Sequence, residues 1–345
     1  MKPSHVIPIA ALCAALPAAG CGGETTASGA PVKAKAAKTA TAPAGRIAFR
    51  RYLDDAQTHG ALFTINPDGS DERQVTHPPA GVVDDQPDWS HDGKRLAFQR
   101  CPGEDPCSVW TIRADGTHAR KVKVRCTLAR ICDVNSPSWL PHRRLVVGLA
   151  QGRVHFHGDA DQIERFSIEL VDPRHHTQRT VIARDHWTGD TAEPNASADG
   201  GTIVYKRWNS WTTKPRRGIS LYTVSIRGKH NRRLTPWALE AGDHAVLSPN
   251  GKKAFFRSFS ESDDKQSDYY TVRLRDRKLT RLTHYPAGTL ALSGSFSGDG
   301  RWIVHGSTGV DGQADVFVMR ADGTDQRPVT RTAVWDSAPD WSPRP

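Results

Sequence analysis

The chain has 345 residues, of which 37% are hydrophobic and 24% are charged, and its formal net charge at pH 7 is +10. This is an ordinary globular composition, and the chain is long enough to bury a substantial core. No nucleic-acid motif accompanies the basic balance, which excludes nucleic-acid recognition and favours anionic lipid or a wall polymer at the surface.

The first 20 residues predict an export signal. Lys2 provides a positive start, and the run from Val6 to Ala19 is apolar and made mostly of small residues. A membrane-spanning helix needs about 20 apolar residues, so this shorter run is interpreted as a signal peptide.

Cys21 predicts a lipid anchor. It follows Ala18-Ala19-Gly20, which resembles the bacterial lipobox, although that pattern prefers Leu where this chain has Ala18. Cleavage nearby without acylation, giving a secreted or periplasmic protein, is the alternative. Residues 21–45 contain no aromatic residue and predict a flexible tether to the membrane. Without the signal and the tether, a net charge of about +7 is left on the folded part.

Four cysteines of the exported part predict two disulfides in an oxidising compartment: Cys101, Cys107, Cys126 and Cys132. Three pairings are possible. Cys101 with Cys107 and Cys126 with Cys132 are favoured, because each pair closes one short loop. A metal site is the alternative, but the C-x-x-C spacing typical of zinc is missing.

From residue 46 onward the sequence repeats a unit of four short apolar stretches that alternate with period 2, as half-buried strands do. A Ser-x-Asp-Gly-type turn links the first two stretches of each unit and predicts a hairpin with a type I′ turn. The units begin near Pro87, Pro137, Pro194, Ala245, Gly294 and Pro339.

A four-stranded repeat of this length predicts an all-β fold, a six-bladed β-propeller over residues 46–345. Five units are continuous. The sixth combines a first strand in 336–345 with three strands in 46–76, so the N-terminal strands complete the blade of the C-terminal strand. Such closure leaves the ring without an open edge.

The phrases Pro-Asp-Trp-Ser-His-Asp-Gly-Lys-Arg-Leu-Ala-Phe (87–98) and Val-Phe-Val-Met-Arg-Ala-Asp-Gly-Thr (316–324) resemble the WD-like repeats of the TolB-like propeller family. The resemblance covers about residues 46–345. Related blades serve envelope binding proteins and the gating domains of some serine peptidases. The family's namesake carries an α/β domain before its propeller where this chain has the tether, so its role in envelope assembly is not carried over.

The long, irregular connections of the repeats are expected on one face, at residues 52–60, 101–107, 151–165, 208–218 and 259–268. Binding usually resides in such loops on a rigid scaffold. The connections between repeats approach the channel and carry acids and aromatics that form the candidate ligand site: Asp84, Asp85, Asp133, Asp190, Glu193, Asp243, Asp336, Trp187, Trp237 and Trp335.

These carboxylates and rings would accept a cationic or amphipathic segment of a partner, or a sugar. The alternative is that each acid caps neighbouring backbone N–H groups and that the rings pack within the blades. Carboxylates crowded into one basin would repel, so some should titrate high or hold a cation such as calcium. A metal site at His155, His157, Asp159 and Asp161 is disfavoured against a solvated loop.

The expected function is a non-catalytic, monomeric platform in the cell envelope that binds a protein or peptide and needs no cofactor. Gly294-Ser295-Phe296-Ser297-Gly298 misses the G-x-S-x-G pattern, so a peptidase is disfavoured. The alternative is a carbohydrate-binding or carbohydrate-active propeller in which Asp85 and Asp336 supply the two carboxylates.

Overall fold

The computed structural model describes residues 43–103, 105–128, 130–153, 163–185, 191–208, 218–260, 263–309 and 311–343, which belong to the compact unit Ala42–Pro345. The predicted signal peptide, Cys21 and nearly all of the tether therefore lie outside the described residues and stay predictions. Within the described ranges, no helix has the length and apolarity needed to cross a membrane.

Sixteen of the described strands form four separate antiparallel sheets of four strands each. In chain order they are β8 (Ile131–Leu140), β9 (Arg144–Gly152), β10 (Arg165–Asp172) and β11 (Thr177–Asp185); β12 (Thr191–Ala196), β13 (Thr202–Trp208), β14 (Ile219–Ser225) and β15 (Arg232–Arg233); β16 (Ala241–Leu247), β17 (Lys253–Ser260), β18 (Asp263–Arg273) and β19 (Leu279–Arg281); and β20 (Ala291–Phe296), β21 (Trp302–Thr308), β22 (Ala314–Arg320) and β23 (Arg327–Pro328).

The other eight described strands form one sheet, which divides into two groups of four. These are β24 (Asp336–Trp341), β1 (Ile47–Tyr52), β2 (Gly60–Ile65) and β3 (Arg73–Gln74); and β4 (Val82–Trp89), β5 (Arg95–Pro102), β6 (Ser108–Arg113) and β7 (Arg120–Lys121). A single parallel bridge, between Gly60 and Val83, joins the two groups.

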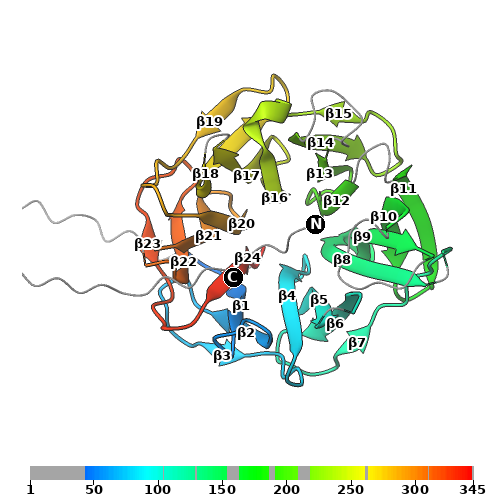
Figure 1. Ribbon diagram of the computed structural model, residues 1–345, viewed down its shortest axis with the longest axis horizontal. Helices are drawn as coiled ribbons and strands as arrows, with labels where there is room; N and C mark the ends of the chain where they lie inside the picture. Colours follow the sequence, from blue (N-terminus) through cyan, green and yellow to red (C-terminus); the bar gives the residue numbers. More distant parts are fainter. Residues whose placement is uncertain are drawn as a thin grey trace, which may run out of the picture. The chain divides into compact units, whose positions relative to one another are not determined.

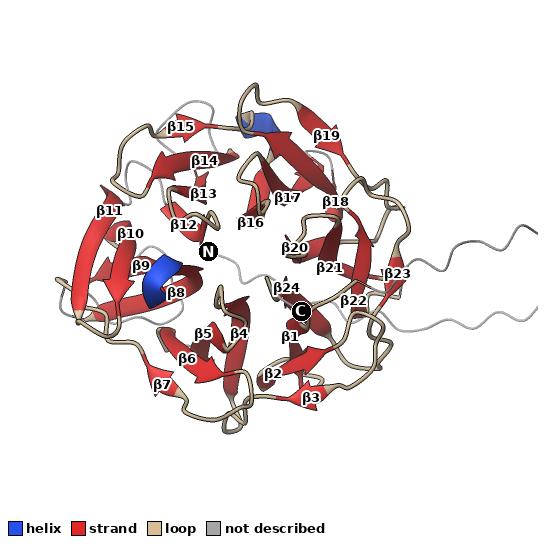
Figure 2. Ribbon diagram, turned by 180° about the vertical axis from the view of Figure 1, so that it is seen from behind, coloured by secondary structure: helices blue, strands red, loops and turns tan. Residues whose placement is uncertain are grey.

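The groups stand around a centre, with β4, β8, β12, β16, β20 and β24 innermost and the last strand of each group outermost (Figure 1). The view from behind shows the same order (Figure 2). The predicted β-propeller is thus confirmed. The number of six blades stays a prediction, because two of the four-stranded groups are hydrogen-bonded as one sheet.

The predicted closure between the two ends of the repeat region is confirmed. β1 pairs with β24 in antiparallel register, with Ile47 opposite Trp341 and Arg51 opposite Asp336. The Arg46 backbone N–H also donates to Ser342 Oγ at 2.9 Å. Figure 1 shows the red C-terminal strand beside the blue N-terminal one.

The core lies between neighbouring groups because successive side chains of a strand point to opposite faces of its sheet. In β1, Phe49 packs in a cluster with Trp302 and Val304 of the preceding group. Its neighbour Ala48 packs in a different cluster with Leu96 of the following group. The two faces of β1 therefore contribute to two different interfaces, and burial of their apolar side chains stabilises both.

The Ser-x-Asp-Gly phrase makes a tight turn by a mechanism that differs from the predicted one. Ser90 Oγ accepts the Arg95 N–H at 2.9 Å, and Asp92 Oδ1 accepts the Lys94 N–H at 3.1 Å. Of these turn residues only Gly93 has a positive φ, 67°. A type I′ turn needs two such residues, so the prediction of that turn type is wrong; five residues, 90–94, link β4 and β5 instead.

These turns and those between the third and fourth strands share one surface, here called the turn face. The remaining connections form the opposite surface, the loop face. One expected loop, 259–268, is mostly strand, since the backbone pairing of β17 with β18 continues to Ser260 opposite Asp263.

Candidate functional site

The inner strands carry a bulge where they approach the centre. Their pairing register shifts in all six described inner strands, for example between Asp85 and Asp88 of β4. Five residues at these bulges have the left-handed φ that L side chains rarely adopt: Gln86 (51°), Ser136 (47°), Glu193 (53°), His244 (47°) and Ala338 (52°). Each costs about 1–3 kcal/mol, and such strain often collects at ligand sites.

Directly after the bulge, polar side chains link five of the six described inner strands to the next one around the ring. Asp340 Oδ2 accepts the Trp89 N–H at 2.7 Å, and Asp88 Oδ1 accepts the Trp139 N–H at 2.7 Å. Equivalent bonds join Ser138 to Ala196, Asn195 to Leu247 and Ser295 to Trp341. We call Asp88, Ser138, Asn195, Ser295 and Asp340 the inner belt. The repeated Asp of the Pro-Asp-Trp-Ser phrase therefore holds neighbouring groups together.

The inner belt surrounds a small cavity of about 50 Å³ and holds two carboxyl groups out of water. Burial, followed by the charge of Asp340, raises the pKa of Asp88 well above its usual value. Burial raises the pKa of Asp340 to about 6. Sequence reasoning expected acids that titrate high among the loop carboxylates, and did not single out this pair.

A larger cavity of about 250 Å³, here called the mouth cavity, opens at the loop-face end of the inner strands. It takes charged, polar and apolar groups from several four-stranded groups. Its lining is Arg50, Asp85, Gln86, Glu193, His244, Arg257, Leu292, Ser293, Trp335, Ser337 and Ala338. Three predicted site residues, Asp85, Glu193 and Trp335, are therefore brought together here.

The carboxylates of the mouth cavity are paired with cations. Arg50 Nη1 lies 2.6 Å from Asp85 Oδ2, and its Nη2 donates to Ser337 Oγ at 2.5 Å. Glu193 Oε1 lies 2.5 Å from Lys206 Nζ, and Oε2 accepts the His244 N–H at 2.9 Å. The Arg50–Asp85 ion pair and the hydrogen bond from His244 to Glu193 join adjacent groups, so these contacts of the cavity wall also serve the fold.

Burial and pairing set the charges of the wall. Burial opposes ionisation of Glu193, but the nearby Lys206 charge outweighs it and lowers the Glu193 pKa to about 2. Burial lowers the pKa of His244, which keeps its imidazole neutral at pH 7. Arg257 donates from Nη1 to the Ala291 carbonyl at 2.9 Å. The Trp335 Nε1 is buried and has no hydrogen-bond partner among the described residues.

Three other predicted acids have structural contacts away from the cavity lining. Asp84 accepts two hydrogen bonds from Arg100, at 2.6 and 2.7 Å, and is fully buried. Asp133 accepts the Cys107 N–H at 2.7 Å, and burial raises its pKa.

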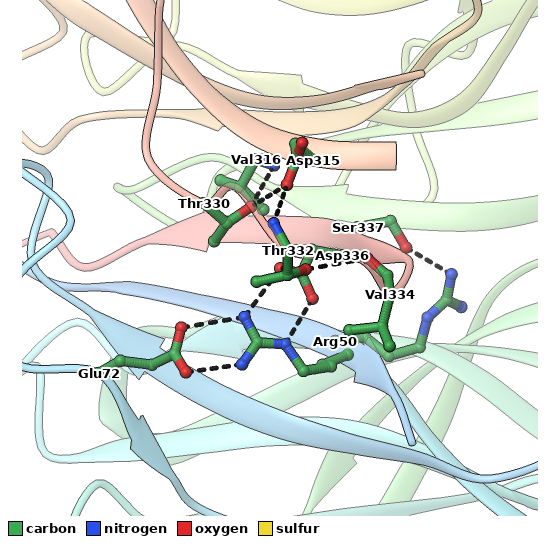
Figure 3. A network of polar contacts seen from close by, with 10 residues as sticks. Arg50, Glu72, Asp315, Val316, Thr330, Thr332, Val334, Asp336 and Ser337 are labelled. Carbon is green, nitrogen blue, oxygen red and sulfur yellow. Dashed lines mark hydrogen bonds and ion pairs between the residues drawn. The ribbon is translucent and has the colours of Figure 1, made fainter. Parts of the chain in front are cut away.

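Asp336 is fully buried at the start of β24 and belongs to a wider polar network (Figure 3). It accepts two hydrogen bonds from Arg51, at 2.7 and 2.8 Å, and one from Thr332 Oγ1 at 3.0 Å. Arg51 also binds Glu72, and burial raises the pKa of Asp336. Asp133 thus caps a backbone N–H, as the alternative expected, whereas Asp84 and Asp336 bind the side chains of Arg100 and Arg51.

Of the other predicted positions, Trp187 and Asp190 lie outside the described residues, as do His155, His157, Asp159 and Asp161. The backbone of Asp243 belongs to β16, while its side chain is outside the description. Trp237 lies in a short 3-10 turn, η4 (Trp237–Leu239), and packs on Tyr222 with ring centroids 5.9 Å apart. The assignment of the predicted residues to ligand binding stays a prediction.

Both favoured disulfides are confirmed, Cys101–Cys107 and Cys126–Cys132. They lie on the loop face and are connected to each other, since the Val134 N–H, two residues after Cys132, donates to the Cys107 carbonyl at 3.0 Å. Among the described residues no group of three or more His, Cys, Asp or Glu side chains is placed to hold a metal ion. Calcium at the mouth stays untested.

Sequence reasoning missed the cations of the mouth cavity. Arg50, Lys206 and Arg257 each follow the apolar triplet of a second strand, where the other groups have Gln99, Gly148 and His305. Aligning the repeats could have found these cations, because residues at equivalent positions of the repeats lie around the same central axis.

No family model matches the sequence, and no curated protein matches it. Solved structures show the fold. TolB from Acinetobacter baumannii matches with a TM-score of 0.66 at 16% identity, over 87% of this chain and 67% of that one. A putative TolB from Agrobacterium tumefaciens matches with a TM-score of 0.60 at 19% identity, over 86% and 92%. The chain is a TolB-like β-propeller in fold.

The expectation that the protein is not an enzyme is wrong, because enzymes share its fold. An oligogalacturonate lyase in complex with manganese shares the fold, with a TM-score of 0.54 at 12% identity over 79% of this chain and 71% of that one. A puromycin hydrolase matches with a TM-score of 0.55 at 14% identity, over 86% and 48%. Propellers of this kind occur in enzymes, so the fold gives no ground for excluding catalysis. The disulfides and the TolB-like fold agree with an extracytoplasmic location.

Proposed function

We propose that the protein is an envelope binding protein whose mouth cavity receives a short segment of a protein partner. The observation that carries the proposal is the mouth cavity itself, about 250 Å³ at the loop-face end of a rigid ring. Its volume suits one or two side chains of an inserted segment rather than a folded surface. Pockets of this kind, with a few converging polar groups, are the usual binding sites of a fold.

The chemistry of the wall favours a segment that carries both polar and apolar groups. The ion pairs at Asp85 and Glu193 leave no excess negative charge to attract a purely cationic ligand. Trp335 and Leu292 line the cavity with aromatic and apolar surface, and Gln86 and Ser293 add polar groups. An amphipathic peptide with a hydrogen-bond acceptor, such as a backbone carbonyl, would satisfy both kinds of group.

The comparisons support protein binding as the class of function. TolB structures and a chain of the nidogen/laminin complex share the fold, the latter with a TM-score of 0.62 at 11% identity over 87% of this chain. We further propose that Cys21 is acylated and that the propeller stands on the outer side of a bacterial membrane. Cysteine acylation with two chains gives stable anchoring, whereas one chain does not.

A bulky residue placed in the mouth cavity tests the proposal without disturbing the ion pairs. Ser293 lines the cavity and is half-buried, so Ser293→Trp should fill it. The matched control is Thr117→Trp, on an exposed turn of the opposite face. Both variants and wild type would be cross-linked in native envelopes and purified, with unfolding midpoints recorded to confirm folding.

We expect a protein captured by wild type and by Thr117→Trp to be reduced at least ten-fold with Ser293→Trp. Equal capture by all three folded proteins would contradict binding in the cavity. Capture of no protein, together with turnover of a glycan by the purified protein, would replace the proposal with the carbohydrate-active alternative.

A further inference from the structure

The positive charge of the molecule is concentrated on three short stretches of the turn face. Residues 225–233, 250–253 and 273–278 contain ten Lys or Arg residues and one carboxylate, Asp276. Their excess of nine positive charges nearly equals the net charge of +10 of the whole chain. The rest of the sequence is therefore close to neutral, and this surface is a local feature rather than a general bias.

Hydrogen bonds between the turns make these stretches one continuous surface. Arg232 donates from Nη2 to the Leu274 carbonyl, which connects the turn after β14 to the turn after β18. The Leu274 N–H in turn donates to the Lys252 carbonyl at 2.9 Å. We call the exposed cations on these three turns the basic sector: Arg227, Lys229, Lys252, Lys253, Arg277 and Lys278.

Within the described part of the chain, the cations of the basic sector are not neutralised by nearby carboxylates. Asp276 Oδ2 lies 2.9 Å from Arg273 and 3.8 Å from Arg275, so the one carboxylate is already shared by two other arginines. None of the six sector cations has an ion pair with a carboxylate of the described residues. Like charges held together in this way cost free energy unless an outside anion compensates them.

One residue of the sector, Arg227, also differs from the residue at the equivalent turn position of other repeats, although the shape of the turn does not require a cation there. Asp68, Asp115 and Asp322 precede the left-handed glycine of the equivalent turns and accept a backbone N–H there. Arg227 occupies that position before Gly228, whose φ is 77°. Ser225 Oγ accepts the Lys229 N–H at 3.0 Å in place of the missing carboxylate. The turn is thus formed with a cation where the other copies have an acid.

We propose that the basic sector docks the propeller on the anionic phospholipid headgroups of a membrane surface. The turns of this face are short, so the flexible side chains of several cations can reach a flat membrane surface together. The sector has no cavity or fixed fork that would select a single phosphate, and each Lys or Arg near an anionic leaflet contributes roughly 1 kcal/mol. Such binding weakens as salt screens the charges.

The path of the chain agrees with this orientation. Arg46 binds Asn66 and Asp71, at 3.2 and 2.7 Å, and these residues belong to the turn between β2 and β3. Residues 43–46 therefore join the propeller at the turn face. A turn face held at the membrane directs the loop face and the mouth cavity away from it. The docking is independent of which ligand the cavity binds.

Co-sedimentation with lipid vesicles tests the docking apart from any acyl anchor. The full chain with Cys21→Ser would be mixed with vesicles of phosphatidylcholine alone or with 30% phosphatidylglycerol. The sector variant replaces four cations by glutamine, Arg227, Lys229, Arg277 and Lys278. The matched control makes the same change of charge at exposed residues elsewhere, Lys94, Arg120, Lys121 and Lys123. Unfolding midpoints show that both variants are folded.

We expect binding to the anionic vesicles only, decreased at least ten-fold in the sector variant and less than three-fold in the control. Raising the salt from 0.1 to 0.5 M should weaken the wild-type binding in the same way. Equal losses in both variants, or no binding of the parent protein to anionic vesicles, would overturn the proposal. Sector-dependent binding to soluble polyphosphate without vesicle binding would also overturn it, and would assign the surface to a polymer.

Discussion

The mouth cavity and the basic sector both carry many charges, but the charges are used differently. In the cavity wall each described carboxylate is paired: Asp85 with Arg50, and Glu193 with Lys206. In the sector six exposed cations share no carboxylate among the described residues. Paired, half-buried charges fix the positions of neighbouring groups, whereas unpaired, exposed charges remain available to a partner.

The difference teaches which charges can be removed without loss of the fold. A buried ion pair that loses one member leaves an uncompensated charge out of water, which costs several kcal/mol. A cation on an exposed turn loses little on neutralisation, since water already solvates it. Removing one member of an ion pair on the loop face should therefore lower stability, whereas removing a cation of the basic sector should weaken binding.

The largest effect is expected at a paired carboxylate of the loop face. Asp84→Ala removes the fully buried partner of Arg100, whose side chain is only 21% exposed. We expect a loss of about 3–5 kcal/mol in the free energy of unfolding, measured with denaturant. The control is the exposed Asp71, which pairs with Arg46 and Arg73, and Asp71→Ala should have a much smaller effect. Similar losses for both would break the comparison.

The carboxyl groups of the inner belt should make the stability of the protein depend on pH. The folded-state pKa of Asp340 is raised to about 6, so the folded protein takes up a proton that the unfolded chain does not. Stability should therefore rise as the pH falls from about 7 to 4. Asp340→Asn keeps an acceptor for the Trp89 N–H and removes the part of this dependence that comes from Asp340, while the raised pKa of Asp88 retains a part of it.

At pH 8 the Asp340→Asn variant should be about 3 kcal/mol more stable than wild type, and at pH 4 the two should be similar. The measurement is the urea unfolding midpoint across this pH range. An unchanged pH dependence in the variant would show that the buried carboxyl pair does not titrate as described.

The disulfides should matter for stability by a comparable amount. Cys126 and Cys132 are six positions apart, and the constraint of such a loop on the unfolded chain is about 2 kcal/mol. Replacing both by serine should lower the unfolding free energy by that amount, without changing the vesicle binding expected of the turn face. A loss of vesicle binding would instead couple the two faces.

The smallest effect on stability is expected in the basic sector. Lys229→Gln, Lys252→Gln and Arg277→Gln should each change the unfolding free energy by less than about 0.5 kcal/mol, with a slight gain from reduced repulsion. Thermal unfolding at low and high salt is the measurement. A loss above 1 kcal/mol at any of them would show that the cation has a structural partner.

The fold could be predicted because its signals are local and repeated. The Ser-x-Asp-Gly turn and the alternating triplets such as Leu96-Ala97-Phe98 recur along the chain. One repeat is divided between residues 336–345 and residues 46–76, which predicted that β24 and β1 belong to one group. The turn type was missed because Asp-Gly is compatible with more than one turn, and hydrogen bonds of Ser90 and Asp92 decide between them.

The site was harder to predict because charge on a loop does not show its partner. Asp84, Asp85 and Asp336 were read as a ring of acids, whereas Arg100, Arg50 and Arg51 from second strands pair with them. Those pairings depend on register and on contacts across groups, which follow from tertiary packing. The same limit hid the inner belt, whose donors and acceptors are about 50 or more residues apart.

One measurement tests directly whether the two faces meet different partners. A photo-reactive residue would be placed at Ser293 in the mouth cavity, or at Lys229 in the basic sector, and activated in native membranes. The account predicts a protein adduct from position 293 and phospholipid adducts from position 229. Lipid adducts from the cavity, or the same protein adduct from both positions, would contradict it.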